Sequence, residues 1–159
     1  DAGQPDLSAA AARARTALAE AAYEDFLRLR FPTGLDFSPR RRERSARRFR
    51  AFLDQARKEL DAAAEAYRAV GQHPGGTPEL RLRALARTGQ LDARFVEILL
   101  GAEIPRDVRT GELAADKIAA YCDQMEASIA AVEERADAAF AECRAQAAGK
   151  APWAAVCDR

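Results

Sequence analysis

The sequence predicts an all-α protein, a helical bundle with two long heptad-patterned helices and shorter helices packed alongside. Hydrophobic residues make up 48% of the chain and much of that share is alanine, whereas aromatic residues make up only 7%. Alanine is the best helix former and a poor strand former. Apolar residues also recur at helical spacing over two long stretches, and no convincing run alternates apolar and polar residues as a strand would.

The 159 residues are the size of one domain, so we expect residues 1–159 to form a single helical unit. We expect residues 1–6 to be a flexible N-terminal segment and residues 149–159 to be a tail folded back on the last helix. The opening "DAGQPD" suits an exported or lipid-anchored chain after processing, and fits an internal domain boundary equally well. The chain has no run of about 18 apolar residues, so no transmembrane helix is predicted.

The first helix is expected from about Leu7 to Leu29, where Pro32 and Gly34 interrupt the pattern. Ser38 and Pro39 then form the combination of an N-cap and a proline in the first turn, which predicts a second helix over about 39–70. Its apolar positions are spaced alternately three and four residues apart, which is the heptad stripe of a coiled-coil-like pair. The stripe consists of Ala46, Phe49, Leu53, Ala56, Leu60, Ala63, Tyr67 and Val70.

Thr77 and Pro78 repeat the capping signal and predict a third, shorter helix to Leu100, which Thr88-Gly89 could split. The fourth helix is expected over about 112–148, with Gly149 and Pro152 ending it. It carries a second heptad stripe on two neighbouring rows of the helix surface. The rows are Ile118, Met125, Val132 and Ala139, and Cys122, Ile129, Ala136 and Cys143.

Seven arginines fall between Arg40 and Arg50, at the start of the second helix. Six lie off the heptad stripe, which predicts a solvated outer face. A helix N-terminus is already positive, so the cluster should be offset by acidic neighbours or by an anionic partner. The candidate contact residues for such an anion or partner are Arg40, Arg41, Arg44, Arg47 and Arg48.

The fourth helix is the expected source of the offsetting acids. It carries a net charge of −5 from Glu112 to Arg144, whereas the second helix carries +5, so the two long helices are predicted to pair. Basic and acidic residues balance at 25 each over the whole chain. This balance does not favour a nucleic-acid partner, which usually requires overall basicity.

The sequence contains no recognisable catalytic, metal-binding or cofactor-binding motif. His73 is the sole histidine and lies in a glycine-rich turn, without a signalled nucleophile. A di-iron site in a helical bundle needs two Glu-x-x-His motifs, which one histidine cannot provide. The sequence also has no Cys-x-x-Cys motif and no glycine-rich phosphate loop. We therefore expect no enzyme activity, no cofactor and no metal.

The cysteines carry more information. The residues after Pro152 can fold back toward Cys143, so a Cys143–Cys157 disulfide is predicted, and with it an oxidising compartment such as the periplasm or the extracellular space. The alternative is a set of reduced thiols in a cytosolic protein. Cys122 cannot reach Cys143 along the same helix and is expected to be buried and free.

These features together predict a non-enzymatic binding or scaffold module, periplasmic or cell-surface associated, that acts through protein–protein contacts. One alternative is a cytosolic adaptor that dimerises through its heptad stripe. Another is a binder of a small apolar ligand, with a cavity between helices near Phe26, Phe95 and Phe140. The sequence indicates neither the identity of a partner nor the oligomeric state.

Overall fold

The computed structural model describes residues 7–148 and 155–157, and its regular elements there are all helices. They are α1 (Leu7–Leu27), α2 (Arg42–Gly71), α3 (Pro78–Leu100), α4 (Ala114–Ala147) and the short 3-10 helix η1 (Ala155–Cys157). The predicted all-α bundle with two long helices is therefore confirmed. The segment expected to be flexible, residues 1–6, and all of the tail except η1 lie outside the described residues.

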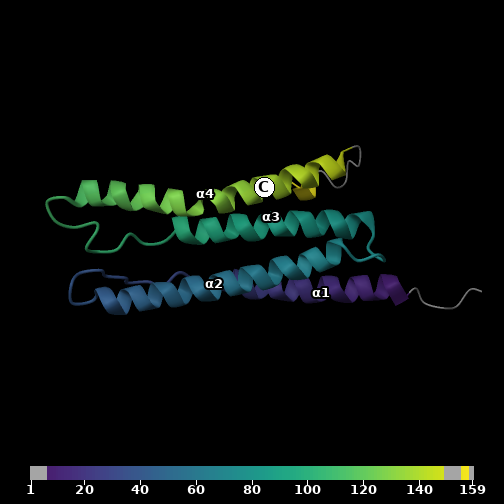
Figure 1. The fold of residues 1–159 in the computed structure, drawn as a ribbon, viewed down its shortest axis with the longest axis horizontal. Helices are drawn as coiled ribbons and strands as arrows, with labels where there is room; N and C mark the ends of the chain where they lie inside the picture. The colour runs from purple at the N-terminus through teal and green to yellow at the C-terminus, as the bar shows by residue number, and fades with distance from the viewer. Residues whose placement is uncertain (1–6, 149–154, 158–159) are drawn as a thin grey trace, which may run out of the picture.

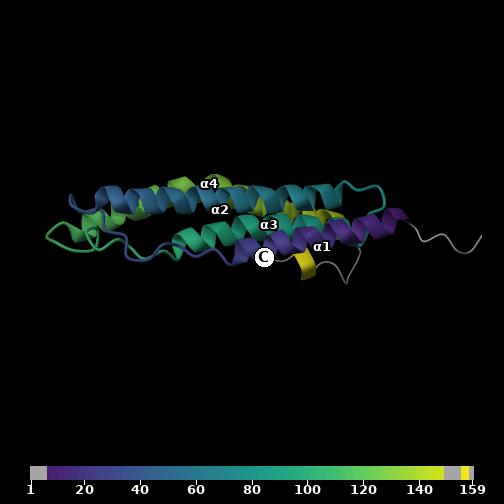
Figure 2. The same ribbon diagram turned by 90° about the horizontal axis from the view of Figure 1, so that it is seen from below.

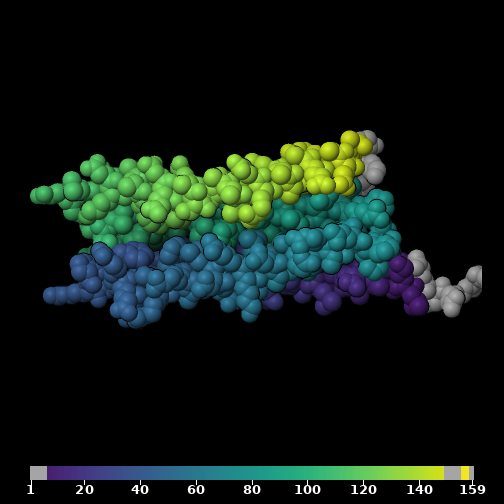
Figure 3. Space-filling model, in the orientation of Figure 1, coloured from purple at the N-terminus to yellow at the C-terminus, as the bar shows by residue number. Residues whose placement is uncertain are grey.

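The four long helices lie side by side along the longest axis of the molecule (Figure 1). Figures 1 and 2 together show two layers, with α2 and α4 in one layer and α1 and α3 in the other. Helix α3 packs against both α2 and α4, and α1 packs mainly against α2. The space-filling view shows a furrow between α2 and α4 with α3 at its floor (Figure 3).

The predicted pairing of the two long helices is wrong, because α2 and α4 make almost no direct contact. Their apolar stripes face α3, which lies between them, instead of facing each other. Burial of α3 decides this arrangement, since its buried residues occur all along the helix from Leu82 to Leu99. Burying a large apolar side chain contributes about 1.5–3 kcal/mol, whereas an exposed ion pair contributes about 0–1 kcal/mol.

Helix α2 begins at Arg42, three residues later than predicted. The Ser38 carbonyl accepts hydrogen bonds from the backbone N–H groups of Arg41 and Arg42, so residues 38–41 form a turn ahead of the helix. The N-cap position is taken by Arg41, whose side chain makes no capping hydrogen bond. The serine and proline therefore mark the turn and not the first helical residue.

The predicted start of α3 is correct, since the Thr77 side chain accepts a hydrogen bond from the Leu80 N–H and Pro78 occupies the first turn. The helix also runs through Thr88-Gly89 without a break. Gly89 is buried, and a Cβ atom built there would lie 3.1 Å from the ring of Phe140 on α4. The glycine therefore allows a close approach of the two helices and does not end the helix.

The core follows the predicted stripe of α2 closely only in its C-terminal half. Ala56, Leu60, Ala63, Tyr67 and Val70 are all buried. The three earlier members of the stripe are only half-buried, and Ser45 and Phe52 are buried in their place. A seven-residue repeat drifts by about 20° per heptad on a straight α-helix, which shifts the buried face by about this much.

One end of the bundle lacks a complete set of helices, and we call it the loop end. There the chain leaves α1 and runs through residues 28–41 beside the first half of α2. The Phe31 ring contacts the rings of Phe49 and Phe52, with centroid distances of 5.8 and 5.2 Å. The loop of residues 101–113, which connects α3 to α4, completes this end.

Candidate binding site at the loop end

A cavity of about 310 Å³ opens at the loop end, and we call it the aromatic cavity. Its wall comes from all the segments that meet there: residues 28–41, α2, α3, the 101–113 loop and α4. Most of the wall is apolar. The lining residues are Phe31, Leu35, Phe37, Phe49, Leu53, Arg57, Phe95, Leu99, Pro105, Tyr121, Gln124, Met125 and Ser128.

The cavity exists because the helices have different lengths. Arg135 of α4 pairs with Asp92 of α3 at 2.9 Å, and the Cys143 Sγ atom lies 3.5 Å from the Leu82 carbonyl oxygen. This antiparallel register places the end of α3, at Leu100, opposite the middle of α4. The first turns of α4 therefore extend past α3 and cover the cavity together with segment 28–41, which is not helical.

Two hydrogen-bonded links hold the loops around the cavity. The Phe37 N–H donates to Asp107 Oδ1 at 2.9 Å, which joins segment 28–41 to the 101–113 loop. The Asp36 N–H donates to Oγ of the buried Ser45 at 3.0 Å, which fixes the same segment to α2. Hydrogen bonds from Ser38, and to a smaller degree the charge of Arg41, hold the pKa of the Asp36 carboxyl below its ordinary value.

Few polar groups line the aromatic cavity, and among its described lining residues Arg57 is the sole charged side chain. Arg57 is exposed and has no ion pair or hydrogen bond within residues 7–148 and 155–157. Across the furrow, α4 contributes Tyr121 and Gln124, whose side chains likewise have no hydrogen-bond partner in the described part of the chain. Burial raises the pKa of Tyr121, so its hydroxyl is a neutral donor at neutral pH.

The predicted arginine face is exposed to solvent, as expected: Arg40, Arg41, Arg44, Arg47 and Arg48 are all exposed. Arg47 pairs with Glu43 at 2.6 Å and Arg41 with Asp36 at 3.3 Å, while Arg48 donates to the Thr33 carbonyl at 2.9 Å. The ion pairs found on this face come from local residues. The prediction that acidic residues of α4 offset the positive charge of these arginines is wrong, because α2 and α4 lie on opposite sides of the furrow.

Three of these arginines gather around a second hollow, of about 340 Å³, which is polar. Arg41, Arg44 and Arg48 line it together with Gly34, Asp36 and Ser45. Asp36 already pairs with Arg41, and the Ser45 hydroxyl already accepts from Asp36. Its groups are therefore largely engaged with one another, except for Arg44, which extends from the exposed side of α2.

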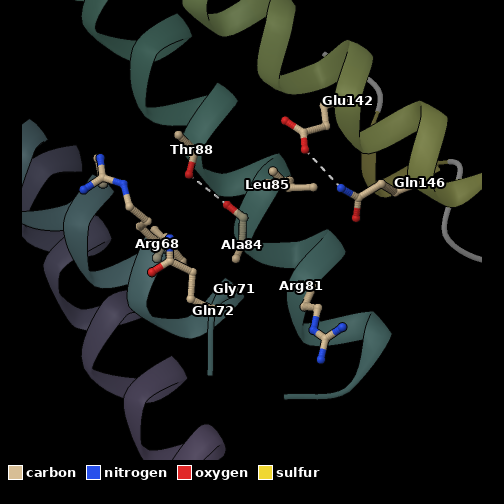
Figure 4. Close-up of a pocket in the computed structure, with 11 residues that line it drawn as sticks. Arg68, Gly71, Gln72, Arg81, Ala84, Leu85, Thr88, Glu142 and Gln146 are labelled. Atoms are coloured by element: carbon tan, nitrogen blue, oxygen red, sulfur yellow. Dashed lines mark hydrogen bonds between the residues drawn. The ribbon is translucent and has the colours of Figure 1, made fainter. Parts of the chain in front are cut away.

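A third pocket, of about 370 Å³, lies in the furrow at the opposite end of the bundle (Figure 4). Figure 4 shows side chains from α2, α3 and α4 around it, including Arg68, Arg81 and Glu142. The Thr88 hydroxyl donates to the Ala84 carbonyl and the Gln146 amide donates to Glu142. Both charge signs are present and many of the polar groups are satisfied locally, so this pocket selects no particular ligand.

The three phenylalanines predicted to line a cavity do not share the same cavity. Phe95 does line the aromatic cavity. Phe26 is 0% exposed within the main core, and Phe140 is 1% exposed in a separate cluster with Ala93 and Ala136. A partial signal for the cavity was present in the sequence, because Phe31, Phe37 and Phe49, which line it, all fall within one short stretch of the chain.

The predicted disulfide is present, with a Cys143–Cys157 S–S distance of 2.06 Å. It holds η1 against α3 and α4, where Cys143 and Cys157 form a small core with Leu82, Ala86 and Ala147. Cys122 is free, as predicted, but it is exposed and not buried. It lies on the part of α4 that extends past α3, where no helix covers that row of the stripe.

Two ion-pair networks between helices were not foreseen from the sequence. Glu20 of α1 binds Arg83 and Arg87 of α3, with distances of 3.0 and 3.1 Å. The Arg87 guanidinium also lies 4.5 Å from the centre of the Tyr23 ring. The second network is the Asp92–Arg135 pair between α3 and α4. These contacts fix the helix register and lie away from the aromatic cavity.

His73 is half-buried, and its Nδ1 accepts a hydrogen bond from the Gly75 N–H, which closes the turn before α3. Within residues 7–148 and 155–157, no group of three or more His, Cys, Asp or Glu side chains could hold a metal ion. In the same residues, no helix combines the length and apolar character needed to cross a membrane.

Comparison with known proteins adds no assignment: no family model, no curated protein and no solved structure matches this chain.

Proposed function

We propose that the protein is a non-enzymatic binding module, and that a partner protein docks on its loop end and places an apolar side chain in the aromatic cavity. The observation that carries this proposal is the cavity itself, which combines aromatic and aliphatic walls with exposed arginines nearby. Aromatic residues, methionine and arginine are the types enriched in the centres of protein interfaces. Leu100, the last residue of α3, and Leu113, the last residue of the 101–113 loop, are 54% and 62% exposed and add apolar surface there.

We propose further that the protein works in an oxidising compartment, in the periplasm or at the cell surface. The support is the disulfide, since such bonds persist in oxidising compartments and are rare in the cytosol. Because the disulfide closes α4 against η1, it also secures the end of the bundle that is opposite the cavity. The proposed docking site and the cross-link therefore do not interfere with each other.

Site-specific photo-crosslinking tests the docking site. A benzophenone amino acid replaces Phe49, on the cavity wall, and in a control variant it replaces Leu18, which is 71% exposed on α1. After irradiation in cells that naturally make the protein, we expect a discrete protein adduct at Phe49 and not at Leu18. Equal labelling at both positions, or no protein adduct at Phe49, would refute a partner protein at the loop end.

A small apolar ligand is the second candidate for the occupant. The observation that favours it is the volume of about 310 Å³, within the range of about 300–1,000 Å³ usual for small-molecule sites. Mass spectrometry of protein purified from its natural source, first under native conditions and then after denaturation, separates the two. A co-purifying small molecule that is released on denaturation would favour this second candidate over a partner protein.

A further inference from the structure

We propose that the group that enters the aromatic cavity is an amphipathic anion, in which a bulky apolar body is joined to a single carboxylate that binds Arg57. This inference rests on the proposed function and gives the chemistry of the occupant. It follows from the juxtaposition of an apolar wall with one cation and two neutral donors that have no partner among residues 7–148 and 155–157.

Arg57 differs from the arginines of the exposed face in its surroundings. Arg41 and Arg47 have carboxylate partners on their own surface. Arg57 has no such partner within the described residues, although Asp54 and Asp61 occupy positions three before and four after it on the same helix. It shares the cavity wall with apolar residues such as Leu53 and Met125, and no acidic side chain is among the described residues that line the cavity. A cation beside an apolar surface favours an anion that also has an apolar part.

The donors at the cavity come from both sides of the furrow. Arg57 extends from α2, whereas Tyr121 and Gln124 extend from α4. A carboxylate between the two helices could accept hydrogen bonds from the guanidinium on one side and from the phenol or amide on the other. Hydrogen bonds to a charged acceptor are about twice as strong as neutral ones. The body of the ligand would then contact Phe49, Phe95 and Met125.

One cation on the wall selects a monoanion. A phosphate or a dicarboxylate would leave a second negative charge without a cation on the wall, next to apolar surface, and burying an unpaired charge is unfavourable. The polar hollow lined by Arg44 and Arg48 does not contribute to the wall of the aromatic cavity, so it supplies no second cation there.

The test compares two probes of nearly identical shape, 1-naphthylacetate and its neutral amide, 1-naphthylacetamide, by titration calorimetry on the whole chain. We expect the acid to bind roughly fivefold to tenfold more tightly than the amide, the scale of a partly exposed charged hydrogen bond. In Arg57→Gln this preference should disappear while amide binding is unchanged. The control Lys58→Gln removes the same charge from a side chain that does not line the cavity, and should keep the preference.

The outcomes separate the two proposals. Suppose that the wild type binds the acid and the amide equally, and that the cavity-filling variant Leu53→Trp abolishes the binding of both. This result would refute the preference for an anion and would still identify the cavity as the binding site. Failure of both probes to bind, with helicity and melting temperature intact, would overturn the cavity and the proposed function with it.

A second pair of probes, capped Asp-Trp and capped Asn-Trp dipeptides, identifies the source of the anion. A preference for the Asp-Trp peptide that Arg57→Gln removes supports an acidic segment of a partner protein. Binding of naphthylacetate without measurable binding of either peptide would support an anionic occupant. It would also refute the partner protein and identify the occupant as a free small acid.

Discussion

The substitution Gly89→Ala tests how tightly α3 and α4 interlock. A Cβ atom at Gly89 would lie 3.1 Å from both Cε2 and Cζ of Phe140 and 3.2 Å from Cδ2. These distances are shorter than ordinary van der Waals contact between carbon atoms, about 3.5–4.0 Å. Phe140 is 1% exposed and packs against Ala93 and Ala136, so its ring has little room to withdraw.

Two effects of opposite sign determine the result. Replacing glycine by alanine inside a helix stabilises it by about 1 kcal/mol, because alanine has the higher helix propensity. Adding a methyl group to a filled core destabilises it by about 1–3 kcal/mol. Since three ring atoms are affected at once, we expect the clash to exceed the gain and the free energy of unfolding to fall by about 1 kcal/mol.

Urea denaturation followed by circular dichroism measures this change, with the disulfide intact. Gly71→Ala is the matched control, because a Cβ atom there meets only the Ala84 Cβ at 3.9 Å, and we expect stabilisation of up to about 1 kcal/mol. The double variant Gly89→Ala with Phe140→Leu should lose less stability than the sum of the two single changes. If Gly89→Ala stabilises the protein as much as Gly71→Ala does, the interlock argument is wrong.

Four further predictions concern other contacts. Denatured, unreduced protein should show one free thiol, Cys122, and this thiol should also react in the folded state. Reduction of the disulfide should lower the free energy of unfolding by about 3 kcal/mol. Three reactive thiols before reduction would contradict the disulfide. Reversing Arg47 and Arg48 to glutamate should change the free energy of unfolding by less than about 1 kcal/mol, by an amount that shrinks as salt is added. Tyr67→Phe should stay within about 1 kcal/mol of the wild type, because no group among the described residues meets hydrogen-bond geometry with the buried hydroxyl. Burial, and then the charge of the nearby Glu20 carboxylate, raise the pKa of Tyr67. A loss above about 2 kcal/mol would show that this carboxylate accepts a hydrogen bond from the hydroxyl. Asp36→Asn should destabilise the protein at neutral pH, and the difference should shrink as acid protonates Asp36 through its lowered pKa. A difference in the free energy of unfolding that does not change with pH would contradict this linkage.

The sequence was sufficient to predict the helices and most of their buried faces, because both depend on local spacing. Ile129, Ala136 and Cys143 lie on the predicted stripe of α4 and all three are buried. It was not sufficient to predict which helices would be neighbours. A stripe shows that a face is buried without showing what buries it, and the opposite charges of α2 and α4 contribute too little to decide the packing. The predicted burial of Cys122 was wrong for the same reason, because the apolar row of α4 to which it belongs continues beyond the end of α3.

The aromatic cavity could not be predicted from residue types alone because it depends on a difference in helix length. At 1.5 Å per residue, the 23 residues of α3 span about 34 Å, whereas the 34 residues of α4 span about 51 Å. About 17 Å of α4 therefore extends past the helix that covers the rest of it, and α1 does not reach this end either. The chain closes the gap with loops and phenylalanines, which fill the space less completely than a helix would. Arg57 lies on α2 within this gap, so an ordinary surface arginine of a heptad helix becomes the charged group beside an apolar cavity.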